Sequence, residues 1–464
     1  MRAWEYEFNK YHNASPVNFK ENPSDWSGIA DVLKARQVHL KMFWSSQVPG
    51  SRAPESLYMA MIQSWYNRGF DVSEAEKLIR PALASLKEGR LNELERLSGQ
   101  ILKRLMQAPV DKTHPSHQFF RPEGWEDIRA AFREGAETEL PMRRESDSKT
   151  LEQKILGGWN GQIAGGSYGT AIEGYTGETL RRVYGDRLNG YIKEPETLND
   201  DITFELAVLK AAERSGAAMS AEYIADMWLE YIPFGWSAEY FALENLRRGY
   251  YPPASGQIGN FFSEWIGAQM RTMVCGYLAP GNPLKASEYA YMDSSVSHEA
   301  NGIYGGIHSA VLSSLAFVMN DARELLLKSR DFIPEDTEFA HFFDSALESV
   351  RNHNNHIDSW KSLEDSIKTY NWIHVYPNMM AVIHGFWYCE NDIGKAFRIL
   401  ADCGADVDCN AGEVGSALGI MFPIDRKWTD PFEDTLETYV PGMEKMKISE
   451  LAGWTADIVM KMEH

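Results

Sequence analysis

The sequence of 464 residues contains no run of 18 apolar residues, which argues against a membrane-spanning helix. Its first 19 residues lack the apolar core of a secretion signal, so we do not expect a leader peptide. Cysteine is rare, and Cys275, Cys389, Cys403 and Cys409 are too few for a disulfide framework. We therefore expect a cytoplasmic protein that keeps its thiols reduced.

Positive charge is also scarce, since 46 Lys and Arg residues stand against 66 Asp and Glu residues, for a net charge of −20. Such acidity repels nucleic-acid backbones and anionic lipids, so we expect neither nucleic acid nor a membrane as partner. Solubility alone explains the acidity, although it also suits a site that collects divalent cations. GxSxG, Walker A, HExxH and GxGxxG after a strand are absent, so the familiar nucleophile and phosphate-loop motifs give no guide.

Alternating strand patterns are few, whereas apolar residues recur every three or four positions along most of the chain. The clearest such segments are 30–44, 55–70, 74–107, 205–219 and 302–319. We therefore predict an all-α fold.

The length of the chain exceeds one ordinary core, and the charged segment 133–150 is typical of a linker. We place a boundary near residue 145. It separates an N-terminal helical module of unknown role, residues 1–145, from a larger helical domain, residues 146–464.

A stripe of glycines opens the larger domain, with Gly157, Gly161, Gly165 and Gly169 spaced every four residues. Each isolated glycine costs a helix about 1 kcal/mol relative to alanine. Four on one face therefore indicate close backbone approach to a second helix. Packing accounts for the glycines but not for Glu173, which follows one turn later, where the helix should be ending.

Two short acidic segments are candidates for chemistry. The first has Asn199, Asp200 and Asp201 at the start of a predicted helix, where an N-cap followed by acidic residues is common. Adjacent ionised carboxylates repel each other, and a divalent cation between them would remove that repulsion. Taken alone, this segment is explained equally by capping and by metal binding.

The second acidic segment places Asp406, Asp408 and Asn410 at alternate positions, as the first ligands of an EF-hand loop are placed. Ala411 stands where that loop needs glycine and Ala417 where it needs a bidentate glutamate, so an EF-hand is excluded. What remains is an acidic loop that enters a helix of small residues. Its oxygen ligands suit Mg²⁺, Mn²⁺ or Ca²⁺ better than zinc.

Histidines offer weaker signals. His298 precedes a glycine-rich helix and is more often a structural hydrogen bonder than a catalyst at such a place. His353 and His356 have a spacing that could bind metal on a helix. No matching acidic partner is evident, so we interpret both as surface residues.

Three segments, in this order, resemble signatures of the ADP-ribosylglycohydrolase family: residues 160–174, 199–202 and 404–410. The first matches a GxxxGDxxG helix that ends near a glutamate, here Glu173, with Gly166 in place of the family aspartate. In the second, Asn-Asp-Asp-Ile stands where the family has Thr-Asp-Asp-Thr.

The third segment keeps the two aspartates of the family's Gly-Asp-Thr-Asp-Thr loop. It carries Cys409 where many members have Thr or Ser, as in a branch of the family with Asp-Thr-Asp-Cys-Asn. The resemblance covers about residues 154–425 and leaves 1–145 outside.

The resemblance implies an all-α catalytic domain with an N-terminal helical extension, and two Mg²⁺ or Mn²⁺ ions in a central cleft, with a single ion as the alternative. The implied metal ligands are Asn199, Asp200, Asp201, Asp406, Asp408 and Cys409. Cys409 is the weakest of these, because a thiol is a poor ligand for Mg²⁺. Asn410 is an alternative ligand.

Glu173 and Asp408 are the catalytic residues that the resemblance implies, with Glu173 acting at the anomeric carbon. Gly259, Asn260 and Gly267 are expected in a loop near the substrate diphosphate, where backbone amides approach anionic oxygens.

The implied activity is metal-dependent hydrolysis of an ADP-ribosyl or related ribosyl N-glycosidic bond, on a small molecule or an ADP-ribosylated protein. The departures from the family pattern leave two alternatives. One is a hydrolase of a smaller riboside or nucleoside. The other is a catalytically silent member that binds ADP-ribose-like ligands or serves a structural role. Retention of Glu173 and all four aspartates favours an enzyme.

Overall fold

The computed structural model describes residues 1–16, 29–136 and 148–462. Helices dominate these residues, and strands occur in them only as three two-stranded ribbons. The predicted all-α fold is therefore confirmed. The predicted boundary near residue 145 lies outside the described residues.

The elements before that boundary are α1 (Ala3–His12), α2 (Ile29–Trp44), β1 (Ser46–Gln47), β2 (Pro54–Glu55), α3 (Leu57–Asn67), α4 (Ser73–Glu76), α5 (Ile79–Lys87), α6 (Leu91–Met106), η1 (Pro115–Gln118) and α7 (Trp125–Ala130). The first half of the larger domain comprises α8 (Ser148–Gly169), β3 (Tyr175–Thr176), α9 (Gly177–Tyr184), η2 (Gly185–Asn189), α10 (Asp200–Ser215), η3 (Gly216–Ala218), α11 (Ala221–Tyr231), α12 (Ser237–Arg247), α13 (Ala254–Gln257), η4 (Ile266–Ala268), α14 (Met273–Tyr277), α15 (Pro283–Ser294) and α16 (Asn301–Ala316). The second half comprises α17 (Ala322–Ser329), η5 (Arg330–Phe332), α18 (Glu338–Asn352), α19 (His356–Ile367), α20 (Val375–Tyr388), α21 (Ile393–Cys403), β4 (Gly404–Ala405), α22 (Val407–Met421), η6 (Arg426–Trp428), η7 (Asp430–Phe432), β5 (Thr435–Glu437), β6 (Lys445–Lys447) and α23 (Ile448–Met462).

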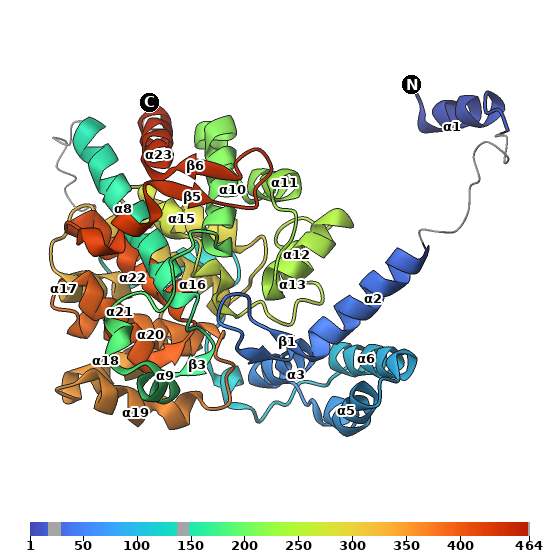
Figure 1. The fold of residues 1–464 in the computed structure, drawn as a ribbon, viewed down its shortest axis with the longest axis horizontal. Helices are drawn as coiled ribbons and strands as arrows, with labels where there is room; N and C mark the ends of the chain where they lie inside the picture. The colour runs from blue at the N-terminus through green and yellow to red at the C-terminus, as the bar shows by residue number, and fades with distance from the viewer. Residues whose placement is uncertain (17–28, 137–147, 463–464) are drawn as a thin grey trace.

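Helices α8, α16 and α22 form the centre of the larger domain (Figure 1). Every residue of α16 is buried, and α22 is buried along nearly its whole length. A helix that is buried on all sides needs apolar or small residues all round, and both helices are rich in Gly, Ala, Ser, Ile and Leu. These helices form the floor against which the site is built.

The predicted glycine stripe makes the contact between α8 and α22. A Cβ atom on Gly157, Gly161 or Gly165 would overlap the carbonyl oxygen of Gly419, Gly415 or Ala411, respectively. One on Gly169 would overlap the backbone at Asp408. The prediction of close backbone approach is confirmed, and the stripe brings the end of α8 against the start of α22.

The N-terminal module packs closely on the larger domain. Trp65 stacks edge-to-face with Phe261 at 4.9 Å between ring centroids, and Trp265 Nε1 donates a hydrogen bond to Ser64 Oγ at 2.9 Å. Arg121 forms an ion pair with the buried carboxylate of Glu264. By contrast, α1 buries none of its residues and stands apart from the body in Figure 1.

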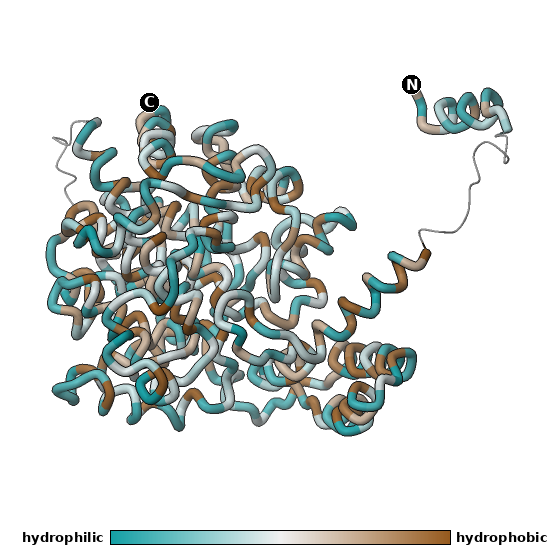
Figure 2. The backbone as a smooth tube through the Cα atoms, in the orientation of Figure 1, coloured by the Kyte–Doolittle hydropathy of each residue, from teal (hydrophilic) through white to brown (hydrophobic). Residues whose placement is uncertain are grey.

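Apolar residues concentrate inside the body, as the tube in Figure 2 shows, and helices carry alternating polar and apolar stretches at its surface. Within the described ranges, no helix combines the length and apolar character needed to cross a bilayer. All four cysteines are buried and free, which confirms that the chain has no disulfide framework.

Candidate metal centre and active site

Two helix N-termini bring the acidic segments together. Asn199 caps α10 by accepting a hydrogen bond from the Asp201 backbone N–H at 2.7 Å, so the capping interpretation is correct. Its amide nitrogen also reaches Asp408 Oδ2 at 3.3 Å, at the start of α22. Cys409 Sγ lies 3.5 Å from Asp201 Oδ1. Segments about 200 residues apart thus form one acidic centre.

The centre contains a group of side chains with the geometry of a metal site. Ligand atoms of Asp406, Asp408 and Cys409 all lie within 4.8 Å of one another, and all three side chains are buried. The Oδ1 atom of Asp406 and the Oδ1 atom of Asn410 are buried without a hydrogen-bond partner among the described residues. Oxygen atoms of this kind are available to coordinate a cation.

Glu173 is brought to this centre by the ribbon β3–β4. Residues Tyr175 and Ala405 pair across it, and the Gly174 N–H donates to the Ala405 carbonyl at 2.9 Å. Because Glu173 precedes β3 and Asp406 follows β4, the ribbon fixes the two carboxylates on the same side of the fold. Glu173 is only 8% exposed.

The electrostatics of the centre are unfavourable in the absence of a cation. Burial, followed by the neighbouring carboxylates, raises the pKa values of Glu173, Asp201 and Asp406 well above their usual range. Burial together with Asp408 raises the pKa of Asp200 to about 6. No cationic side chain is among the leading influences on these pKa values. A divalent cation would supply the missing positive charge, so the residues fit such an ion.

Asn199 differs in role from the threonine of the family pattern. Its amide oxygen is engaged by the Asp201 N–H, so it acts first as a cap and a bridge to Asp408. A Cβ atom at Gly166 would come within 3.2 Å of the Asn199 amide nitrogen. The glycine that replaces the family aspartate therefore leaves the space that Asn199 occupies.

In the predicted diphosphate loop, the side chain of Asn260 bonds to neighbouring backbone groups and not to the acidic centre. The Asn260 amide nitrogen donates to the carbonyls of Ala238 and Ser297 at 3.0 and 2.9 Å, and its oxygen accepts from the Phe262 N–H. Asn260 is fully buried and its amide is occupied by the protein itself. Gly259 has φ +62 and no neighbour facing its Cβ position, which makes it a turn residue.

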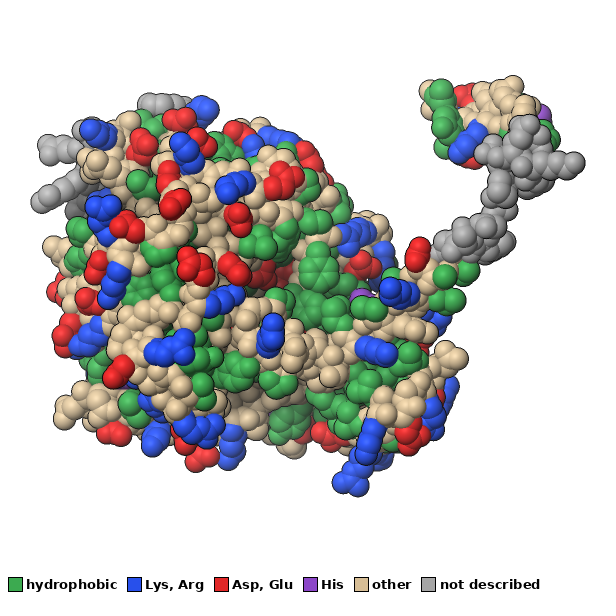
Figure 3. Space-filling model, in the orientation of Figure 1, with side chains coloured by type: hydrophobic (Ala, Val, Ile, Leu, Met, Phe, Trp, Pro, Cys, Tyr) green, Lys and Arg blue, Asp and Glu red, His purple; other side chains and the backbone are tan. Residues whose placement is uncertain are grey.

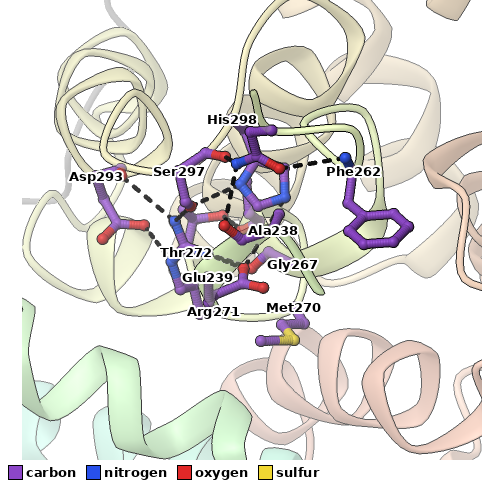
Figure 4. Close-up of polar contacts among 12 residues, drawn as sticks. Ala238, Glu239, Phe262, Gly267, Met270, Arg271, Thr272, Asp293, Ser297 and His298 are labelled. Atoms are coloured by element: carbon purple, nitrogen blue, oxygen red, sulfur yellow. Dashed lines mark hydrogen bonds and ion pairs between the residues drawn. The ribbon is translucent and has the colours of Figure 1, made fainter. Parts of the chain in front are cut away.

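Gly267 belongs to a buried network around Arg271 (Figure 4). Arg271 binds Asp293 Oδ2 at 2.8 Å, and both Glu239 Oε1 and the Gly267 carbonyl at 2.7 Å. Burial raises the pKa of Glu239 to about 7, against the lowering effect of Arg271. His298 joins through Ser297 at 2.7 Å, as the interpretation of a structural hydrogen bonder predicts.

The network around Arg271 contacts the acidic centre through Met270, and the sequence analysis did not identify it. Met270 precedes Arg271 and its sulfur lies 3.8 Å from Cys409 Sγ. The sequence signal for this network was Arg271 itself, an arginine inside a run of small and apolar residues at positions 266–279.

The interpretation of His356 as a surface residue without an acidic partner is wrong, since its Nε2 lies 3.0 Å from Asp402 Oδ2.

Comparison with known proteins bears on the larger domain. The family model for ADP-ribosylglycohydrolase matches residues 147–462. A solved structure described as an ADP-ribosylglycohydrolase-related protein complex is similar at 17% identity with a TM-score of 0.45. That similarity covers 68% of this chain and 100% of the other. No curated protein sequence matches this chain.

Proposed function

This chain belongs to the ADP-ribosylglycohydrolase family, and on that premise we propose that it is a metal-dependent hydrolase of an ADP-ribosyl or related ribosyl N-glycosidic bond. The observation that carries the proposal is the convergence of Glu173 with four aspartates from two distant segments in one buried centre. The substrate is a small ribosyl compound or an ADP-ribosylated protein.

The residues that would hold Mg²⁺ or Mn²⁺ are Asp200, Asp201, Asp406 and Asp408, with Asn410 offering an amide oxygen that lacks a partner. When bound, such an ion supplies positive charge that orients ribose hydroxyls and activates water. Cys409 contributes a soft sulfur beside these hard oxygens, and Asn199 positions Asp408 through its amide.

Glu173 supplies the proton chemistry. Its pKa is raised by burial first and by Asp408 second, so the carboxyl retains a proton at pH values where an ordinary glutamate is ionised. Cleavage of a ribosyl C–N bond builds negative charge on the leaving nitrogen and positive charge on the sugar. A protonated carboxyl at that place donates its proton to the leaving group.

Hydrolysis of a smaller riboside is the second candidate. It is favoured by Asn260, whose backbone N–H already donates to the Gln257 carbonyl at 3.4 Å and so is not free for a diphosphate. A silent binder is the third candidate, but it has no evident use for five buried or half-buried carboxylates that destabilise one another.

A substrate panel distinguishes these candidates. Purified protein is incubated with ADP-ribosyl-arginine, ADP-ribosyl-serine peptides and a series of nucleosides, with Mg²⁺ or Mn²⁺ and then with a chelator. Metal-dependent release of ADP-ribose supports the proposal, and release of ribose from nucleosides alone supports the second candidate. Binding of ADP-ribose without turnover of any substrate would overturn the hydrolase assignment.

A further inference from the structure

A hairpin of the N-terminal module lies directly on the turn that carries Glu173. The hairpin comprises residues 46–55, with β1 and β2 as its strands. Ser51 accepts a hydrogen bond through its carbonyl from Tyr175 Oη at 3.2 Å. A Cβ atom on Gly50 would overlap Thr170, and Ala53 packs against Gly174. The hairpin therefore contacts residues that flank Glu173 in the sequence on both sides, Thr170 before it and Gly174 and Tyr175 after it.

The other end of the hairpin is fixed to the start of α12. Glu55 is buried and accepts hydrogen bonds from Ser46 Oγ at 2.9 Å and from Trp236 Nε1 at 3.3 Å, at the start of α12. The hairpin thus spans from the Glu173 turn to α12, in the middle of the face shown in Figure 1. Figure 3 shows a hollow near the centre of this face, with acidic side chains at its floor and basic ones at its edge.

Arg52 is the cation at the tip of this hairpin. It lies between Ser51 and Ala53, the residues that touch the Glu173 turn, and its side chain is exposed. It has no hydrogen bond or ion pair through its side chain to any described residue. Its φ of +62° is costly for a residue with a side chain, and such strain concentrates where a residue has a role.

Other arginines of this region are already neutralised. Arg271 is bound by Glu239 and Asp293, and Arg121 by Glu264. A substrate diphosphate brings two negative charges to a centre that is itself acidic. The Asn260 backbone N–H, expected near the diphosphate, already donates to the Gln257 carbonyl at 3.4 Å, and the guanidinium of Arg52 matches phosphate oxygens in charge and geometry.

We propose that the hairpin of residues 46–55 forms a wall of the substrate cleft and that Arg52 binds the diphosphate of an ADP-ribosyl substrate. The inference rests on the proposed function for the identity of the anion. It gives the N-terminal module, which lies outside the family match, a part in substrate selection. Substrates without a diphosphate gain nothing from Arg52.

Calorimetric titration with ADP-ribose in the presence of Mg²⁺ tests the proposal on the full chain. Arg52→Gln is expected to weaken binding at least about tenfold, equivalent to about 1.4 kcal/mol. Arg52→Lys should recover part of that affinity, because it restores charge but not the bidentate geometry. Arg80→Gln is the matched control, since Arg80 is an exposed arginine of α5 in the same module.

Steady-state kinetics distinguish a role of Arg52 in binding the diphosphate from a role in positioning the reacting bond. Because the diphosphate is bound alike in the ground and transition states, Arg52→Gln should raise KM for ADP-ribosyl-arginine and leave kcat within about twofold. Unchanged affinity of the Arg52→Gln variant for ADP-ribose would overturn the inference, as would a wild-type protein that does not bind ADP-ribose. Wild-type binding that depends on Arg52 without any turnover would instead support the inference and overturn only the proposed hydrolase function.

Discussion

At the scale of the residue, Glu173 combines burial with proximity to a second acid. Burial and the neighbouring aspartates raise its pKa. In the proposed mechanism, proton donation falls on Glu173 and ion binding on the aspartates. Substitution distinguishes the two roles.

Glu173→Gln keeps the shape of the side chain and removes its proton chemistry. We expect kcat to fall by about 10²–10⁴-fold, the usual contribution of a positioned acid, while metal content is unchanged. Steady-state kinetics and elemental analysis measure the two effects. Glu178→Gln, an exposed glutamate at the start of α9, is the matched control. Near-normal kcat in the Glu173 variant would remove the residue from the mechanism.

Cys409 is the other residue of the acidic centre whose chemistry substitution can test. Its thiol lies beside Asp406 and Asp408, and burial followed by the Asp201 charge raises its pKa. Cys409→Thr places a hydroxyl where the thiol was. We expect Mg²⁺ affinity to rise and Cd²⁺ affinity to fall, because oxygen is the harder ligand. Calorimetric titration of each ion measures this, with Cys403→Ala as a control thiol outside the cluster. Equal metal preferences in all three proteins would mean that the sulfur does not contact the ion.

At the scale of the element, the contact of α8 with α22 sets the position of the site. Gly165→Ala would place a methyl group against the Ala411 carbonyl, so the helices must separate. We expect a loss of about 3 kcal/mol or more in the free energy of unfolding, at the upper end for overpacking of a core. Gly99→Ala on α6, where nothing faces the Cβ position, should instead stabilise by up to about 1 kcal/mol. Urea unfolding of both variants measures the difference, and similar stabilities would show that the stripe does not clamp the helices.

The same contact shows how far the sequence could predict the structure. Glycine spacing is a local signal with one physical meaning, so the pairing of the stripe with another helix followed from residues 157–169 alone. The two acidic segments could be joined only through resemblance to a family, because nothing local in Asp201 indicates Cys409. Asn260 was unpredictable for the same reason, since its partners Ala238 and Ser297 are set by long-range packing.

Helix α22 also carries a buried acid that makes stability depend on pH. Burial raises the pKa of Glu413 from 4.5 to about 8, although Gln269 donates to it at 2.6 Å. The unfolded chain releases this proton near pH 4.5 and the folded chain near pH 8, so the stability from this group is lost as pH rises between those values. The slope is at most about 1.4 kcal/mol per pH unit.

Glu413→Gln cannot ionise, so its unfolding free energy should fall less steeply with pH than that of the wild type between pH 6 and 8, by up to about 1.4 kcal/mol per pH unit. Guanidinium unfolding at a series of pH values measures the two slopes. Glu450→Gln, an exposed glutamate of α23, should keep the wild-type slope. Parallel slopes for the wild type and the Glu413 variant would mean that Glu413 is ionised in the folded protein.

At the scale of the whole molecule, the N-terminal module is joined to the larger domain by polar and apolar contacts together. Arg121 neutralises Glu264, which is buried in the larger domain, and the Pro122 carbonyl accepts a hydrogen bond from Tyr304 Oη at 2.7 Å. Ser64 satisfies the indole of Trp265. The family match begins at residue 147, yet the core of that domain includes groups that are paired with the preceding residues.

Removal of the module therefore tests whether residues 148–464 fold alone. Loss of Arg121 leaves the Glu264 carboxylate buried without its cation, which costs about 3–5 kcal/mol for a broken buried pair. Exposure of Phe261 and Trp265 adds an apolar patch, so we expect this shorter chain to aggregate or to unfold well below the full chain in temperature. A chain that lacks only residues 1–16 should keep the Tm of the full protein, because α1 buries no residue. Differential scanning calorimetry of the three chains measures this, and an unchanged Tm for residues 148–464 would show that the larger domain is an independent folding unit.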